Sequence, residues 1–139
     1  MHEFHAWIGL GESAFESDEG HLEEKLAQLH GLVADSVWHD AVFAVHSLNG
    51  GHFFTATGFI NRQRDEGERL NLFLATIARR LPGSYGLIYE RDDEMSPPYG
   101  PNAFRIRVLA RGKITEHPDP FLSPCDPAIE DNTDYLDLL

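Results

Sequence analysis

The sequence predicts an α+β fold: a two-layer sandwich with two helices on one face of a mostly antiparallel sheet of about five strands. Five segments are strand-like by alternation or by β-rich composition, and two others have apolar residues at helical spacing, in the order β-α-β-β-α-β-β. An Asn-Gly pair also separates the second and third strand-like segments, as in a tight hairpin. Such a sheet keeps one face free of helices, and that face is a candidate contact surface.

The chain begins with a predicted strand and a predicted helix. Residues 2–10 alternate between two faces, and Trp7 lies on the face opposite the main apolar side chains. Residues 17–34 open with Ser17 and several acids, which favour a helix N-terminus, and continue with leucines at helical spacing. We therefore expect a helix over residues 17–34 that packs its leucine stripe on the sheet.

A β-hairpin is the most specific local prediction. Residues 41–48 and 52–60 are rich in β-branched and aromatic residues, and Asn49 and Gly50 lie between them. Both central positions of a two-residue hairpin turn need a positive φ, which Asn and Gly tolerate best. The sequence therefore predicts that these two strands pair directly.

The second half of the chain repeats the helix and strand patterns. Residues 63–81 have acids early and arginines late, and a Pro-Gly pair ends the predicted helix. Strands follow over residues 84–91 and 103–111, with residues 113–116 as an extension of the last one. On this register, the helix-free face carries Glu3, His5, Trp7, Arg105, Arg107 and Arg111.

From about residue 117 the chain is proline-rich and acidic, which rules out a central strand or a long helix there. Its first part contains Phe121, Leu122 and Ile129, so we expect it to pack as an ordered strap. A length of 139 residues fits one compact domain, which we expect to span residues 1–139.

Composition limits the partners. The formal net charge is −12, from 23 acidic residues against 11 Lys and Arg, so nucleic acid and anionic membranes are poor partners and a basic protein is a plausible one. The single cysteine, Cys125, cannot form an internal disulfide. We find neither a secretory signal nor an apolar run of roughly 20 residues, and we expect a cytoplasmic protein.

An acidic run, Asp92-Asp93-Glu94, follows the strand that contains Glu90. Carboxylates could hold a divalent ion, so a metal-dependent hydrolase is one alternative. Neighbouring strand residues point apart, however, and no second ligand set such as HExxH is present. We therefore expect no metal, no cofactor and no catalytic residue. A small-ligand module, with an apolar pocket around Trp7, is a further alternative.

Three segments together carry a family resemblance: EFHAWIGLGES, PGSYGLIYERDDE and VLARGKITEHPDPFLSPCDPAIED. In this order the chain resembles immunity family seven of bacterial polymorphic-toxin and contact-dependent inhibition systems. Ala6 stands where the family's Phe-His-Gly-Trp pattern has glycine. The resemblance implies a non-enzymatic cytoplasmic protein that binds and neutralises a cognate toxin domain.

Many such toxins are nucleases with basic surfaces, so we expect the acidic surface to contact the toxin. The first helix and the acidic run supply the charged candidates, and a tryptophan could add an aromatic anchor. The toxin's identity and the oligomeric state stay open. The candidate toxin-binding residues are Glu16, Asp18, Glu19, Glu23, Glu24, Asp92, Asp93, Glu94, Trp7 and Trp38.

Overall fold

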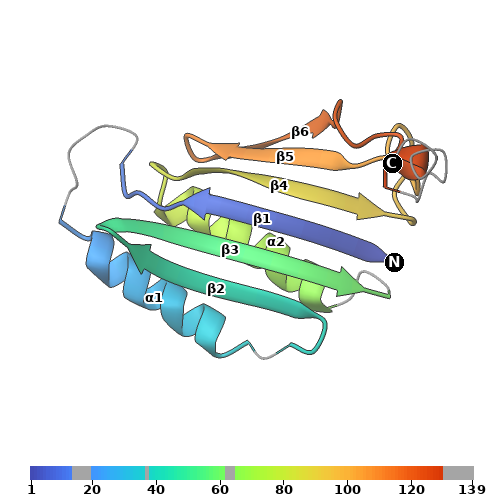
Figure 1. The fold of residues 1–139 in the computed structure, drawn as a ribbon. Coiled ribbons are helices and arrows are strands. Elements are labelled where there is room, and N and C mark those ends of the chain that lie inside the picture. Colours follow the sequence, from blue (N-terminus) through green and yellow to red (C-terminus); the bar gives the residue numbers. More distant parts are fainter. Residues whose placement is uncertain (14–19, 37, 62–64, 130–139) are drawn as a thin grey trace, which may run out of the picture.

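The computed structural model describes residues 1–13, 20–36, 38–61 and 65–129 (Figure 1). Its centre is an open six-stranded sheet in the order β2-β3-β1-β4-β5-β6, and every neighbouring pair is antiparallel. This confirms the predicted α+β class, with one strand more than expected. The strands are β1 (His2–Gly9), β2 (Ala41–Leu48), β3 (Gly51–Ile60), β4 (Tyr85–Asp92), β5 (Arg105–Ala110) and β6 (Lys113–Pro118), and the helices are α1 (Leu22–Ala34), α2 (Asp65–Arg80) and the one-turn α3 (Cys125–Ala128).

The helices α1 and α2 lie on the same face of the sheet (Figure 1). Alternation along each strand sends one set of side chains toward these helices, where they form the core with the helices' apolar stripes. No helix among the described residues is long and apolar enough to cross a membrane. The largest fully buried apolar side chains are Phe4, Ile8, Phe54, Leu70, Phe73, Leu74, Ile77, Leu81, Ile88 and Leu109.

The predicted hairpin is confirmed. Leu48 pairs with Gly51, and the two residues between them have positive φ values, 50° at Asn49 and 80° at Gly50. The left-handed conformation at both positions gives the turn a twist that matches the flanking strands. The sequence of the turn therefore sets the register of β2 on β3.

The start of α1 differs from the prediction. Ser17 lies outside the described residues, and the helix begins at Leu22, after Gly20 with a φ of 85°. The backbone N–H of His21 donates to the carboxylate of the buried Glu12 at 3.2 Å. A carboxylate nine residues earlier in the chain thus satisfies an N-terminal amide of the helix, where the helix dipole also favours negative charge.

Residues 113–116 do not extend the preceding strand, and that prediction was wrong. Arg111 and Gly112 have φ values of 54° and 73°, so the chain reverses and β6 returns antiparallel to β5. Residue 112 tolerates this conformation because glycine has no Cβ. The turn adds the sixth strand to the sheet.

We expected Phe121, Leu122 and Ile129 to pack the segment after β6 onto the rest of the fold, and that prediction was wrong. The side chains of Phe121, Leu122 and Ile129 are exposed, with Phe121 79% exposed. Instead, the buried Asp119 carboxylate accepts the backbone N–H groups of Phe121 and Leu122 and the hydroxyl of Ser123, at 2.7–2.9 Å. The start of the segment is therefore held by hydrogen bonds to a buried carboxylate and not by these three apolar side chains.

Close packing of glycine in the sheet gives a first prediction. A Cβ on Gly58 would lie 2.2 Å from the buried ring of Phe4, so we expect Gly58→Ala to lower the free energy of unfolding by about 1–3 kcal/mol. The control is Gly31→Ala in α1, where a Cβ meets nothing within 4 Å and alanine should stabilise by about 0.5–1 kcal/mol. Urea denaturation measures both, and equal effects would contradict the packing argument.

Candidate partner-binding surface

Two arginines that we expected on the helix-free face lie on the helix side. Arg105 pairs with Glu90 and Arg107 with Ile88 in the register of β4 and β5, and Glu90 and Ile88 point toward the helices. The predicted orientation of β5 was therefore wrong. In β5, Arg105 and Arg107 alternate with Ile106 and Val108. The register of β5 on β4 decides which of these two sets faces the helices.

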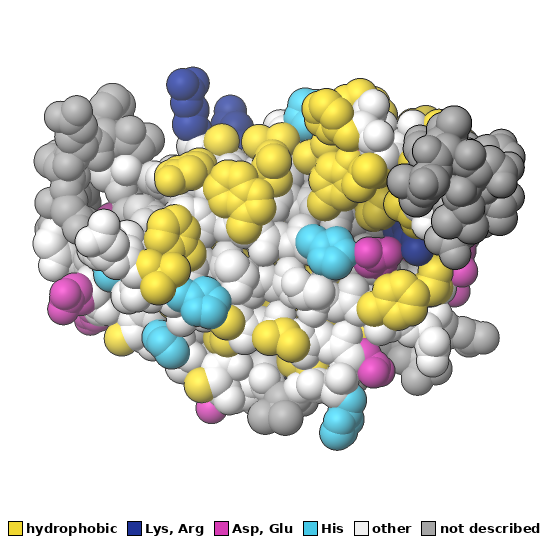
Figure 2. Space-filling view, viewed as in Figure 1, with side chains coloured by type: hydrophobic (Ala, Val, Ile, Leu, Met, Phe, Trp, Pro, Cys, Tyr) yellow, Lys and Arg dark blue, Asp and Glu magenta, His cyan; other side chains and the backbone are white. Residues whose placement is uncertain are grey.

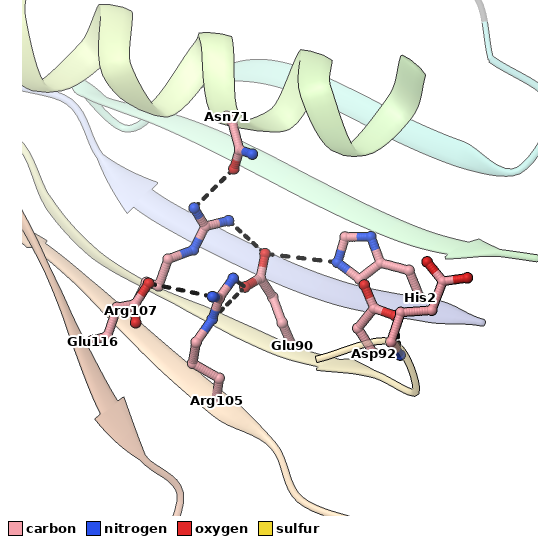
Figure 3. A network of polar contacts seen from close by, with 8 residues as sticks. His2, Asn71, Glu90, Asp92, Arg105, Arg107 and Glu116 are labelled. Carbon is pink, nitrogen blue, oxygen red and sulfur yellow. Dashed lines mark hydrogen bonds and ion pairs between the residues drawn. The ribbon is translucent and has the colours of Figure 1, made fainter. Parts of the chain in front are cut away.

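The two arginines neutralise a buried carboxylate (Figure 3). Glu90 is 1% exposed, and its two oxygens accept from Arg105 Nη2 and Arg107 Nη2, each at 2.5 Å. Arg107 also donates to the side chain of Asn71 on α2 at 2.8 Å. The cluster therefore joins β4, β5 and α2, and it satisfies charges that would otherwise be costly to bury.

The carboxyl group of Glu90 stays ionised in this cluster. Burial alone raises its pKa, but the His2 ring and the guanidinium groups of Arg107 and Arg105 outweigh burial and lower the pKa from 4.5 to about 2. His2 Nε2 lies 3.8 Å from Glu90 Oε1, too far for a hydrogen bond, so we assign the main effect to the arginines. A fully paired, water-excluded carboxylate has a structural role.

The acidic run after β4 does not form a common site. Asp92 is buried and accepts the backbone N–H of Glu94 at 2.9 Å, whereas Asp93 contacts the Met1 ammonium at 2.6 Å. The Glu94 side chain is exposed. Among the described residues, no group of three or more His, Cys, Asp or Glu side chains could hold a metal ion. The arrangement does not resemble the convergent ligand set of a metal-dependent hydrolase.

The helix-free face is largely apolar, and Figure 2 shows its hydrophobic and histidine side chains from the front. As predicted, Glu3, His5 and Trp7 lie on it, because β1 buries the alternate residues against the helices. Trp7 is 49% exposed and packs edge-on against Tyr85, with ring centres 6.2 Å apart. By register with β1, the large exposed apolar side chains of this face are Trp7, Val42, Leu48, Phe59, Tyr85 and Leu87.

This face carries little of the molecule's charge. In the part of the sheet that the structure describes, the register places only Glu3, Arg91 and Lys113 on it as ionised side chains. Glu3 and Arg91 form an ion pair at 3.0 Å. An apolar, aromatic centre with few charges is typical of the core of a protein–protein interface. The helix-free face is therefore the strongest candidate for a contact surface among the described residues.

The acidic candidates that the structure describes lie outside this face. Glu23 and Glu24 are exposed in the first turn of α1, in the helix layer. Glu16, Asp18 and Glu19 fall outside the described residues. Asp92 is too buried to contact a partner, whereas Asp93 and Glu94 are exposed at the end of β4.

Among the described residues, the surroundings of the two tryptophans differ from the apolar pocket that the small-ligand alternative requires. Trp7 lies on the sheet surface described above. Trp38 packs partly buried against the core, and the Arg69 guanidinium lies 6.0 Å from its ring centre. A hollow of about 370 Å³ is lined by Trp38, Arg69, Glu68 and Leu72. Two of the four described side chains that line it are charged, which differs from the mostly apolar lining of a small-ligand pocket.

The apolar residues of the face could have been found in the sequence. In β1, β3 and β4 the positions that alternate with the core also hold large apolar side chains, such as Trp7, Phe59 and Leu87. A strand that is apolar on both faces predicts either burial on both sides or a contact surface. Because helices cover only one face of this sheet, the apolar side chains on the other face form a candidate contact surface.

Comparison with known proteins agrees with the resemblance seen in the sequence. The family model described as Immunity protein 7 matches residues 1–131. Searches of curated proteins and of solved structures give no match. A match over nearly the whole chain includes every strand and helix of the fold described above. The chain therefore belongs to the Immunity protein 7 family.

Proposed function

We propose that this protein neutralises a cognate toxin domain by direct binding, in the cytoplasm of the cell that it protects. The match to the Immunity protein 7 family over residues 1–131 carries this proposal. The toxin would belong to a polymorphic-toxin or contact-dependent inhibition system. A toxin with a basic surface, such as a nuclease, suits an inhibitor with a net charge of −12.

The helix-free face supports this role as the centre of the contact. Its exposed aromatic side chains, Trp7 and Tyr85, present rigid apolar area, and residues of this kind dominate binding energy at interfaces. The exposed carboxylates of Glu23 and Glu24 lie in the helix layer. In this proposal the apolar face supplies affinity, and the acidic residues around it attract a basic toxin.

Electrostatic attraction gives a kinetic prediction. We expect Glu23→Lys combined with Glu24→Lys to slow association with the toxin domain about 10-fold at low salt, because steering by exposed charges acts on the association rate. The effect should fade at high salt, where charges are screened. Stopped-flow fluorescence measures the rates, and Glu23→Gln with Glu24→Gln is the matched control. An unchanged rate at low salt would exclude steering by α1.

Protection of cells tests the proposed function. The probe is the toxin domain encoded beside the gene for this chain, expressed with and without the chain in the same cells. We expect survival only when the chain is present, and a stable complex when an inactivated toxin domain and the chain are purified together. A toxin domain from an unrelated system is the control. Cell death together with the absence of a complex would contradict the proposal.

A further inference from the structure

The edge strand β2 presents a row of backbone groups away from the sheet. Phe59 donates its backbone N–H to the carbonyl of Asp40 at 3.0 Å. In an antiparallel pair, residues that bond to the neighbour alternate with residues that point away. On the register of β2 and β3, the N–H and C=O groups that point away from β3 belong to Ala41, Phe43, Val45 and Ser47.

These outward groups have no backbone partner in the part of the chain that the structure describes. Outside the ladder itself, none of the backbone hydrogen bonds between described residues involves β2. In Figure 1, β2 forms one border of the sheet, and α1 runs along the arrowhead half of this border and projects partly beyond it. The backbone hydrogen bonds of the described residues therefore leave the outward groups of β2 available for pairing with an extended segment.

The two edges of the sheet differ in how they resist such pairing. On β6, Lys113, Glu116 and Pro118 supply the charges and the proline that commonly protect an edge. On β2, six of the eight residues are apolar, and the strand has no acidic residue, no lysine or arginine, and no proline. An edge without these protections is suited to strand addition by a partner.

The surroundings of β2 indicate the charge of that partner. Asp40 directly precedes the strand, and Asp35 ends α1; both side chains are exposed. Glu23 and Glu24 are exposed at the other end of α1. The lysine on α1, Lys25, already contacts Glu12 at 3.2 Å. A second copy of the chain would bring the same acidic flanks, so a basic partner fits better than self-association.

We propose that an extended segment of the toxin domain, uncharged in its middle and flanked by Lys or Arg, adds to the sheet as a strand beside β2. This inference rests on the proposed function and specifies how the toxin is held. Backbone hydrogen bonds to the outward groups supply the pairing, and the acidic residues at both ends of α1 attract the basic flanks. The added strand would become the seventh strand of the sheet and would extend its helix-free face.

Amide hydrogen exchange, resolved by residue with NMR, tests the pairing. The samples are the full chain alone and in complex with the inactivated toxin domain. We expect the outward amides of Phe43, Val45 and Ser47 to exchange quickly in the free chain and at least about 10-fold more slowly in the complex. The amides of Ala44 and His46 face β3 and should be protected in both samples.

The opposite edge supplies the matched control. The same alternation across the sheet places the amides of Ile114 and Glu116 outward on β6, and these should exchange equally fast with and without the toxin domain. In a second control, Ser47→Pro removes one outward N–H and should weaken binding about 10-fold, whereas Ser47→Ala keeps it and should bind normally.

The outcomes separate this inference from the proposed function. A complex in which Phe43, Val45 and Ser47 exchange as quickly as before would overturn strand addition and leave toxin binding intact. Protection of these amides in a dimer of the free chain would assign the edge to a second copy and also overturn the inference. Failure to form any complex would overturn the proposed function and the inference together.

Discussion

Replacing Glu90 with glutamine is expected to lower the free energy of unfolding by about 3–5 kcal/mol at pH 7. The variant leaves the Arg107 guanidinium near the core without its counter-charge and leaves Arg105 with only the exposed Glu116. Removing one partner of a buried ion pair has a cost of this size. The matched control is Glu116→Gln. Glu116 also contacts Arg105, at 3.2 Å, but its side chain is 53% exposed, so the loss should stay below about 1 kcal/mol.

The pH dependence of stability follows from the same carboxylate. Because folding lowers the pKa of Glu90 from 4.5 to about 2, its contribution is complete above pH 4.5 and is lost as the pH falls toward 2. The shift corresponds to about 3 kcal/mol. The stability difference between wild type and Glu90→Gln should therefore shrink over that range, as measured by urea denaturation at a series of pH values. A constant difference from pH 7 to pH 2.5 would contradict this assignment.

Replacing Trp7 with alanine is expected to weaken binding to the toxin domain about 30-fold or more. Trp7 is half exposed at the centre of the helix-free face, and truncating a large aromatic residue at an interface centre often has a cost of about 2 kcal/mol. Isothermal titration calorimetry with the inactivated toxin domain measures the affinity, and circular dichroism checks that each variant is folded.

The control for Trp7 lies on the other layer of the molecule. Leu72 on α2 is 47% exposed, close to the value for Trp7, but it belongs to the helix that covers the opposite face of the sheet. We expect Leu72→Ala to bind the toxin domain with wild-type affinity. The reverse result, with Leu72→Ala weakened and Trp7→Ala unchanged, would move the contact surface to the helices.

Local patterns in the sequence were sufficient for most of the fold. The Asn49-Gly50 turn fixes its own φ values, so the hairpin and its register follow from two residues. The leucine and phenylalanine spacing of residues 63–81 likewise gives α2, since a helical stripe needs only periodicity. Gly112 marked a break in the sequence, but its left-handed conformation, which makes β6 a separate strand, was not predicted.

By itself, the sequence determined most of the secondary structure, the α+β class, the net negative charge and the family. Only the tertiary structure decided which side of β5 faces the helices, because alternation identifies two faces without saying which one is covered. In β5 that choice placed Arg105 and Arg107 against Glu90. In the acidic run it buried Asp92, while the apolar face around Trp7 stayed uncovered. The physical reason is that pairing with neighbouring strands, and not the residues of one strand, sets the direction of its side chains.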